Sequence, residues 1–303
     1  MLSGIHFLLT YACTFECDHC FLYCSPWSQG TFSLEQIQKT LDQASRIKTV
    51  DNVFFEGGEP LLYYPLLLEA VRTAHQAGFK VGIVTNAYLS HTPLDAELWL
   101  KPLARAGLDF LSISDDSFHY GDREITPARI AREKAHELGI SVDSIAISDP
   151  TPEAGDKGGD QKGAPVEGGQ AMFRGRAADK LTSGLAGTDP RKLTKCPYED
   201  LADPSRVHVD AYGNVHLCQG LLMGNMWKTP LPRLVEQYEV GNHPLCSALD
   251  QGGPALLAER LDVDSEPEYV DECHFCFSIR RSLLDRYPEY LAPRQVYGLE
   301  SQG

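Results

Sequence analysis

Short apolar runs alternate with helical patterns along the first half of the chain. The runs begin near residues 5, 52, 79, 108 and 140, and from the second onward they repeat at roughly the length of one strand–helix unit, about 30 residues. Several intervening segments carry apolar residues at helical spacing and stop at a glycine, as helix ends often do. This alternation predicts an α/β fold with a parallel sheet and right-handed crossovers.

The predicted elements follow from these runs. Strands are expected at about 5–10, 52–56, 79–84, 108–114, 140–147 and 171–173, and helices at 65–77, before Gly107 and at 127–138. A further helix is expected to begin at Ser33, because Ser33 and Gln36 have the spacing of a capping box. Ligands of parallel α/β proteins bind at the C-terminal ends of the strands, so polar residues there are candidate site residues.

Three cysteines follow the first apolar run. Cys13, Cys17 and Cys20 are separated by three and two residues. Thiolates are the usual ligands of iron–sulfur clusters, and three of them leave one iron of a four-iron cluster open. A zinc site is an alternative, although Cys17 and Cys20 form a single CxxC pair and zinc knuckles normally combine such a pair with a second CxxC or CxxH pair. A second alternative is an iron–sulfur cluster with four cysteine ligands, in which Cys24 is the fourth and no iron is left open.

The second apolar run ends in Gly57-Gly58-Glu59-Pro60. Glycine lets the backbone approach a ligand closely, although such a segment alone could be a simple turn. The CxxxCxxC array and this GGEP segment together resemble the signature of the radical S-adenosylmethionine (SAM) superfamily. The resemblance covers about residues 1–180 and implies a partial (β/α)6 barrel.

The resemblance implies that Cys13, Cys17 and Cys20 hold a [4Fe–4S] cluster whose open iron is chelated by SAM. One electron from a flavodoxin- or ferredoxin-type donor would split SAM into methionine and a 5′-deoxyadenosyl radical, which abstracts a hydrogen atom from the substrate. His19 lies where the family usually has an aromatic ring. The GGEP segment would receive the SAM amino group. Further candidates for cofactor contacts, by position at strand ends, are Thr85, Asn86, Ser112 and Ser114, for which capping and turn hydrogen bonds are an equal explanation.

A second set of cysteines lies in the C-terminal half. Segments 206–210 and 214–218 read as a hairpin with Gly213 at the turn, and Cys218 completes a GxxxxC arrangement. With the distal Cys273-x-x-Cys276 this resembles a SPASM/twitch module in its shortened form. The implied ligands of one auxiliary [4Fe–4S] cluster are Cys196, Cys218, Cys273 and Cys276, and a structural zinc in the same thiolates is the alternative. Gly175-Arg176-Ala177 is similar to a segment that often ends the barrel in such relatives.

These assignments predict three regions: a barrel at 1–190, an auxiliary-cluster module at 191–285 and a tail at 286–303. Cys24 and Cys246 belong to neither of the two predicted ligand sets. Each could be a small buried hydrophobe or, as in peptide epimerases of the superfamily, a hydrogen-atom donor to a substrate radical; Cys246 also remains a candidate auxiliary ligand. The glycine-rich segment 151–169 is either a solvated loop or a lid.

The amino-acid composition argues against two classes of partner, nucleic acids and membranes. The formal net charge of the 303 residues is −15 and no basic stripe occurs, so we expect no nucleic-acid partner. No apolar stretch has the length of a membrane span, and the N-terminus lacks the basic residues of a signal peptide, so no membrane partner is expected either. The nine cysteines are an odd number, so a scaffold of disulfides alone would leave one unpaired. Seven of them lie in tight clusters or beside a turn motif, which suits metal ligation in a reducing compartment better. We therefore expect a cytoplasmic protein.

Three functions remain open. The first is modification of a ribosomally made peptide or protein, because a barrel with a C-terminal auxiliary-cluster module is most often found there. No leader-recognition domain is expected before the first strand. The second is biosynthesis of a small-molecule cofactor or natural product. The third is a non-catalytic iron–sulfur or zinc protein. Asp115, Asp116 and His119, which follow the fourth strand, are candidates for substrate contacts under the first two.

Overall fold

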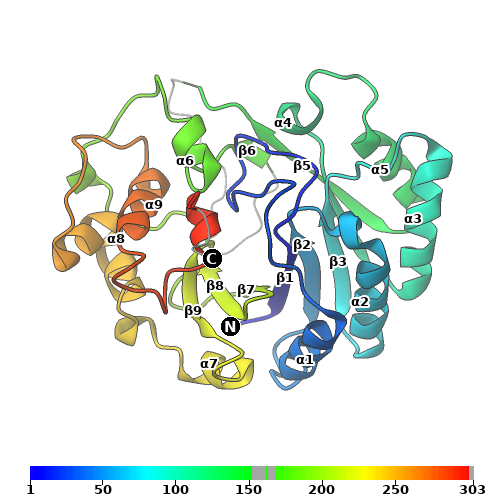
Figure 1. Ribbon diagram of the computed structural model, residues 1–303, viewed down its shortest axis with the longest axis horizontal. Coiled ribbons are helices and arrows are strands. Elements are labelled where there is room, and N and C mark those ends of the chain that lie inside the picture. Colours follow the sequence, from blue (N-terminus) through cyan, green and yellow to red (C-terminus); the bar gives the residue numbers. More distant parts are fainter. Residues whose placement is uncertain (152–161, 163–167, 300–303) are drawn as a thin grey trace.

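The computed structural model describes residues 1–151, 162 and 168–299. One sheet runs through the molecule with the strand order β6-β5-β4-β3-β2-β1-β7-β8-β9 (Figure 1). All neighbours from β6 to β7 are parallel, and β7, β8 and β9 are antiparallel. The strands are β1 (Gly4–Thr10), β2 (Asn52–Gly57), β3 (Lys80–Thr85), β4 (Phe110–Ser114), β5 (Ser141–Ser148), β6 (Gly168–Gln170), β7 (Arg206–Asp210), β8 (Asn214–Cys218) and β9 (Leu221–Asn225). The predicted α/β fold with an open parallel sheet is confirmed.

The predicted helices form between the parallel strands and lie along one side of the sheet (Figure 1). They are α1 (Leu34–Ala44), α2 (Tyr64–Gln76), α3 (Pro93–Ala106) and α5 (Pro127–Glu137). Ser33 and Gln36 form the expected capping box at the start of α1, with mutual hydrogen bonds of 3.2 and 2.8 Å. Gly107 ends α3 in the left-handed region at φ 101°.

The two faces of the central strands differ. Successive side chains of a strand point to opposite faces. Ile5 and Phe7 of β1 and Phe55 of β2 are completely buried in the apolar core. The register pairs His6 with both Phe54 and His208, so the opposite face of β2, β1 and β7 carries two histidines near its middle.

The sixth strand lies three residues earlier than expected. The prediction of a strand at 171–173 is wrong, because β6 ends at Gln170. The following residues turn instead, with the amide of Arg174 donating to the carbonyl of Met172 at 2.8 Å. This turn carries the chain toward the cysteine loop. The segment 151–169, interpreted as a solvated loop or a lid, lies mostly outside the described residues.

The expected hairpin of the C-terminal half is confirmed as β7 and β8. It does not stand apart from the barrel strands, because β7 pairs with β1 over five residues and continues the same sheet. The remaining helices are α4 (Ser117–Tyr120), α6 (Arg176–Lys180), α7 (Leu231–Gln237), α8 (Cys246–Leu261, broken at Gly252 and Gly253) and α9 (Glu272–Ser282). Short 3₁₀ segments are η1 (Pro60–Tyr63), η2 (Pro190–Lys192), η3 (Val240–Asn242) and η4 (Arg294–Tyr297). Within the described ranges, no helix combines the length and apolar character needed to cross a bilayer.

Candidate cluster and cofactor sites

The first three cysteines lie on one loop after β1 and are all half-buried. The amide of Cys20 donates to the carbonyl of Cys17 at 3.0 Å, which closes a turn. Backbone amides also point at sulfur: the amide of Phe15 lies 3.5 Å from Cys13 Sγ, and the amide of Cys24 lies 3.3 Å from Cys20 Sγ. Hydrogen bonds to sulfur tune iron–sulfur clusters. The loop therefore fits a cluster held by three thiolates.

Arg176, at the start of α6, holds this loop through its side chain and its backbone. Its guanidinium donates to the carbonyls of Cys17 at 2.8 Å and Cys24 at 2.7 Å, and its amide donates to the carbonyl of Cys20 at 2.8 Å. Gly175 has φ 61°, and a Cβ atom there would lie 2.5 Å from the backbone of Phe21. The turn after β6 thus clamps the cysteine loop.

The two glycines of the GGEP segment are required by the protein backbone itself. A Cβ atom on Gly57, which has φ 123°, would lie 2.4 Å from the carbonyl oxygen of Thr10, and one on Gly58 would lie 2.1 Å from that of Ala12. The amides of Gly58 and Glu59 donate to the same two carbonyls at 2.7 and 2.8 Å. The segment therefore packs directly on the chain leading to the cysteines, and Pro60 then begins η1.

Glu59 joins the ends of β2 and β3. Its fully buried carboxylate accepts hydrogen bonds from the amides of Leu61 and Asn86, both at 2.8 Å, and from the hydroxyl of Thr85 at 2.7 Å. Burial raises the pKa of Glu59 to about 7. The side-chain amide of Asn86 donates to Thr14 Oγ1 at 3.0 Å. The structure thus brings Glu59, Thr85 and Asn86 together beside the cysteine loop.

The comparison with known families agrees with this arrangement. Residues 7–152 match the family model described as the radical SAM superfamily. Residues 7–152, slightly less than half of the chain, therefore belong to the radical SAM superfamily. Membership implies a [4Fe–4S] cluster and SAM as cofactors, and the three-cysteine loop with its amide–sulfur contacts fits them.

Two curated relatives match over the same region. The chain is 29% identical over 130 residues to the tungsten-containing aldehyde ferredoxin oxidoreductase cofactor-modifying protein of Pyrococcus furiosus, covering 43% of this chain and 35% of the relative. It is 24% identical over 107 residues to a Bacillus subtilis protein named for peptide biosynthesis, and this match covers 35% of this chain and 34% of the relative. The chain thus spans about a third of the length of these two relatives.

The fold is similar beyond the matched domain. The crystal structure of BtrN in complex with AdoMet and 2-DOIA superposes with a TM-score of 0.54 at 16% identity, over 89% of this chain and 98% of that chain. At this identity the similarity concerns the fold, and it includes the strands and helices after residue 152. The superfamily's partial barrel is therefore the architecture of this protein.

Three further predicted residues lie near the strand ends. Ser112 and Ser114 are half-buried on β4. His19 packs against Phe118 and His119, with ring centroids 4.6 and 5.3 Å apart, and burial lowers its pKa to about 4. In this radical SAM chain the neutral ring of His19 thus takes part in an aromatic cluster.

The substrate candidates after β4 form contacts of their own. Asp116 Oδ1 and His119 Nδ1 lie 2.7 Å apart, and the carboxylate also accepts from the amide of Ile147 at 3.2 Å. Asp115 accepts from the hydroxyl of Thr126 at 3.0 Å. Hydrogen bonds within the protein therefore use part of the acceptor capacity of both carboxylates, Asp115 and Asp116.

The second set of cysteines lines one cavity. Cys196 follows η2, Cys218 ends β8, and Cys273 and Cys276 lie in the first turns of α9. Two buried guanidinium groups share the cavity: Arg174 Nη1 lies 3.1 Å from Cys218 Sγ, and Arg280 Nη2 lies 4.0 Å from it. Buried positive charge offsets the negative charge of clustered thiolates. The four predicted auxiliary ligands are thus together, in a set that fits an iron–sulfur cluster or zinc.

The two remaining cysteines are both buried. The thiol of Cys24 is hydrogen-bonded to Cys20, which raises the pKa of Cys24 and lowers that of Cys20 to about 6. Cys246 begins α8 beside the hydroxyl of Tyr238, and it is not among the residues that line the cavity. This placement favours the four-ligand set without Cys246.

Proposed function

We propose that this radical SAM protein is an enzyme that cleaves SAM reductively and uses the resulting 5′-deoxyadenosyl radical to abstract a hydrogen atom from a peptide or protein substrate. The observation that carries the proposal is the packing of the GGEP segment on the loop with three cysteines. Gly57, Gly58 and Glu59 contact residues 8–12, which form the end of β1 and the start of that loop. The residues for cluster and SAM therefore belong to one rigid unit.

The residues of this unit have separate tasks. Cys13, Cys17 and Cys20 would hold the cluster, which would supply the electron for the reductive cleavage of SAM. Glu59 receives the SAM amino group through the acceptor capacity that its three hydrogen bonds leave. Asn86, whose side chain lies 4.0 Å from Cys13 Sγ, connects the cluster loop to the SAM site. His19, Ser112 and Ser114 are the candidates for contacts with the remaining parts of SAM.

We propose a second [4Fe–4S] cluster in the cavity formed by Cys196, Cys218, Cys273 and Cys276. Its support is the convergence of four thiols with Arg174 and Arg280. Burial raises the pKa of Cys196 to about 12, so a bound metal is needed to hold it as thiolate at neutral pH. A structural zinc in the same thiolates is the competing occupant. A flavodoxin- or ferredoxin-type protein would supply electrons.

A peptide substrate is supported by the resemblance of the C-terminal half to twitch modules and by the relative named for peptide biosynthesis. The second candidate is a small-molecule cofactor or natural product, which the cofactor-modifying relative favours. Cys24 is the candidate hydrogen-atom donor in either case. Its burial and its hydrogen bond to Cys20 favour a supporting role in the cluster loop instead.

The proposal is tested with anaerobically reconstituted protein. We expect about eight irons per chain, from two four-iron clusters, and about four after combined replacement of Cys13, Cys17 and Cys20 by Ala. With SAM and dithionite, the wild type should form 5′-deoxyadenosine and the triple variant should not. An unchanged iron content in the triple variant, or no SAM cleavage by the wild type, would contradict the proposal. Peptides encoded beside the gene and a small-molecule extract, each followed by mass spectrometry, separate the two substrate classes.

A further inference from the structure

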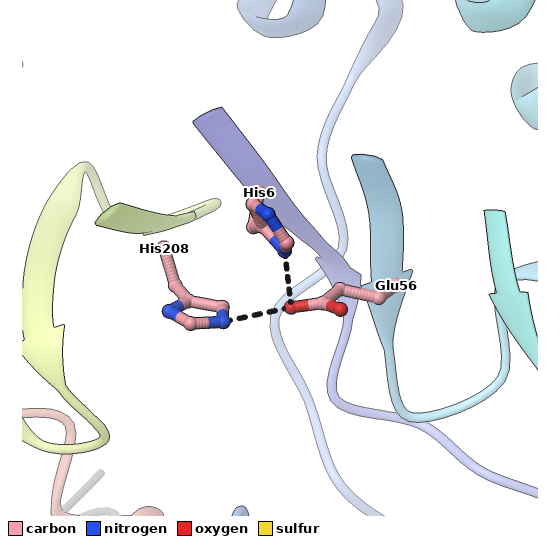
Figure 2. Close-up of side chains that lie close together, drawn as sticks. All are labelled: His6, Glu56 and His208. Carbon is pink, nitrogen blue, oxygen red and sulfur yellow. Dashed lines mark ion pairs between the residues drawn. The ribbon is translucent and has the colours of Figure 1, made fainter. Parts of the chain in front are cut away.

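Three adjacent strands bring two histidines and a glutamate together on one face of the sheet. His6 comes from β1, Glu56 from β2 and His208 from β7, and Figure 2 shows their side chains pointing toward one another. The pairing register accounts for this, because His6 lies opposite His208, and Glu56 is two residues beyond the partner of His6 in β2. The face is the one opposite to the apolar core of Ile5 and Phe7.

The distances suit a single metal ion. Glu56 Oε1 lies 2.9 Å from His208 Nε2 and 3.4 Å from His6 Nδ1 (Figure 2). One potential ligand atom from each residue lies within 4.8 Å of the other two. Nitrogen and oxygen ligands at about 2.0–2.2 Å from one ion lie about 3.0–3.5 Å apart. Small movements of the three side chains would therefore allow one ion to bind all three ligand atoms.

The site is sheltered and held in place. The side chains of His6, Glu56 and His208 are 12, 16 and 9% exposed. The ring of His6 stacks on Phe54 at a centroid distance of 4.8 Å, which limits its rotation. His6 Nδ1 is buried and lacks a hydrogen-bond partner among the described residues, with only the 3.4 Å ion-pair contact to Glu56. A buried nitrogen in this state is costly unless a further ligand satisfies it.

We propose that His6, Glu56 and His208 bind a divalent transition-metal ion, separate from both cysteine sites. Two imidazoles and one carboxylate form a set used by Zn²⁺ and non-haem Fe²⁺, and three protein ligands leave positions for water or a substrate oxygen. Glu56 directly precedes Gly57 of the GGEP segment. The proposed metal therefore lies directly beside the GGEP segment.

Zinc binding by the reconstituted protein tests this site. The protein is equilibrated with Zn²⁺, freed of unbound metal and examined by elemental analysis and zinc X-ray absorption. We expect one zinc per chain with nitrogen and oxygen ligands at about 2.0–2.2 Å rather than only sulfur at about 2.3 Å. Glu56→Gln and His208→Ala should each lower the affinity for this zinc at least tenfold. His91→Ala, at an exposed histidine, should leave it unchanged.

The result of the zinc-binding test can be distinguished from the result of the SAM-cleavage test. Iron content and circular dichroism equal to the wild type identify variants that are folded. Glu56→Gln keeps the side-chain volume and serves where His208→Ala does not fold. Zinc with sulfur ligands alone, or undiminished zinc affinity in the folded variants, would overturn the metal site. Such a result would leave the SAM-cleavage test unaffected, because none of the three residues is assigned to the cluster or to SAM.

Discussion

Loss of the Arg176 guanidinium should loosen the first cluster without touching any of its ligands. Arg176 is buried, with 7% of its surface exposed, and its two side-chain hydrogen bonds end on the carbonyls of Cys17 and Cys24. In Arg176→Ala both carbonyls lose their charged partner. Arg176→Lys, with a single ammonium group, can reach one of them at best.

The magnitude follows from these two bonds. A hydrogen bond to a charged group contributes about 1.5–3 kcal/mol, so Arg176→Ala should destabilise the closed loop by about 3–6 kcal/mol and Arg176→Lys by about half of that. If iron leaves only after the loop opens, about 3 kcal/mol corresponds to a release at least 100-fold faster. Arg191→Ala is the matched control, because Arg191 is 88% exposed and pairs with Asp189, two residues before it.

The assay measures the rate at which a chelator takes iron from the reconstituted protein under anaerobic conditions. A rate is the suitable quantity, because loss of a cluster makes unfolding irreversible. We expect one four-iron cluster to be released quickly in Arg176→Ala, at an intermediate rate in Arg176→Lys, and slowly in the wild type and Arg191→Ala. Equal rates in all four proteins would refute the reasoning that Arg176 clamps the loop.

Two further predictions concern Cys24 and Glu59. Cys24→Ala should keep the N-terminal cluster and still form 5′-deoxyadenosine from SAM; loss of that cluster, with no SAM cleavage by the wild type, would make Cys24 a fourth ligand and the protein a carrier. Burial raises the pKa of Glu59 from 4.5 to about 7, so its contribution to the stability of SAM-free protein is fully present below pH 4.5 and lost as the pH rises through about 7. Between pH 4.5 and 7 the midpoint temperature of thermal unfolding, scanned at one fixed rate, should therefore fall further for the wild type than for Glu59→Gln; the pKa difference corresponds to about 3 kcal/mol. A stability difference that stays constant with pH would contradict the assignment.

Local patterns were sufficient for most of the parallel sheet and its helices. β1 to β5, α2 and α5 lie within about two residues of their predicted positions, as do the start of α1 and the end of α3, because each apolar strand and each capped helix carries its own periodic signal. The sixth strand was misplaced. Its three residues, Gly168–Gln170, have no apolar pattern, whereas the apolar Ala171 and Phe173 are buried in a turn instead. β9, α7, α8 and α9 were not predicted as elements.

The sequence by itself indicated the radical SAM superfamily and grouped seven cysteines into two candidate ligand sets, because the spacing of thiols within a loop and of glycines within a turn is a local property. Only the tertiary structure decided what surrounds them. Arg174 and Arg280 meet Cys218 across 44 and 62 residues, and Arg176 reaches Cys17 across 159. His6, Glu56 and His208 come together because β7 pairs with β1 in one particular register. A shift of one residue would turn His208 to the other face of the sheet, and no pattern within a single segment records that choice.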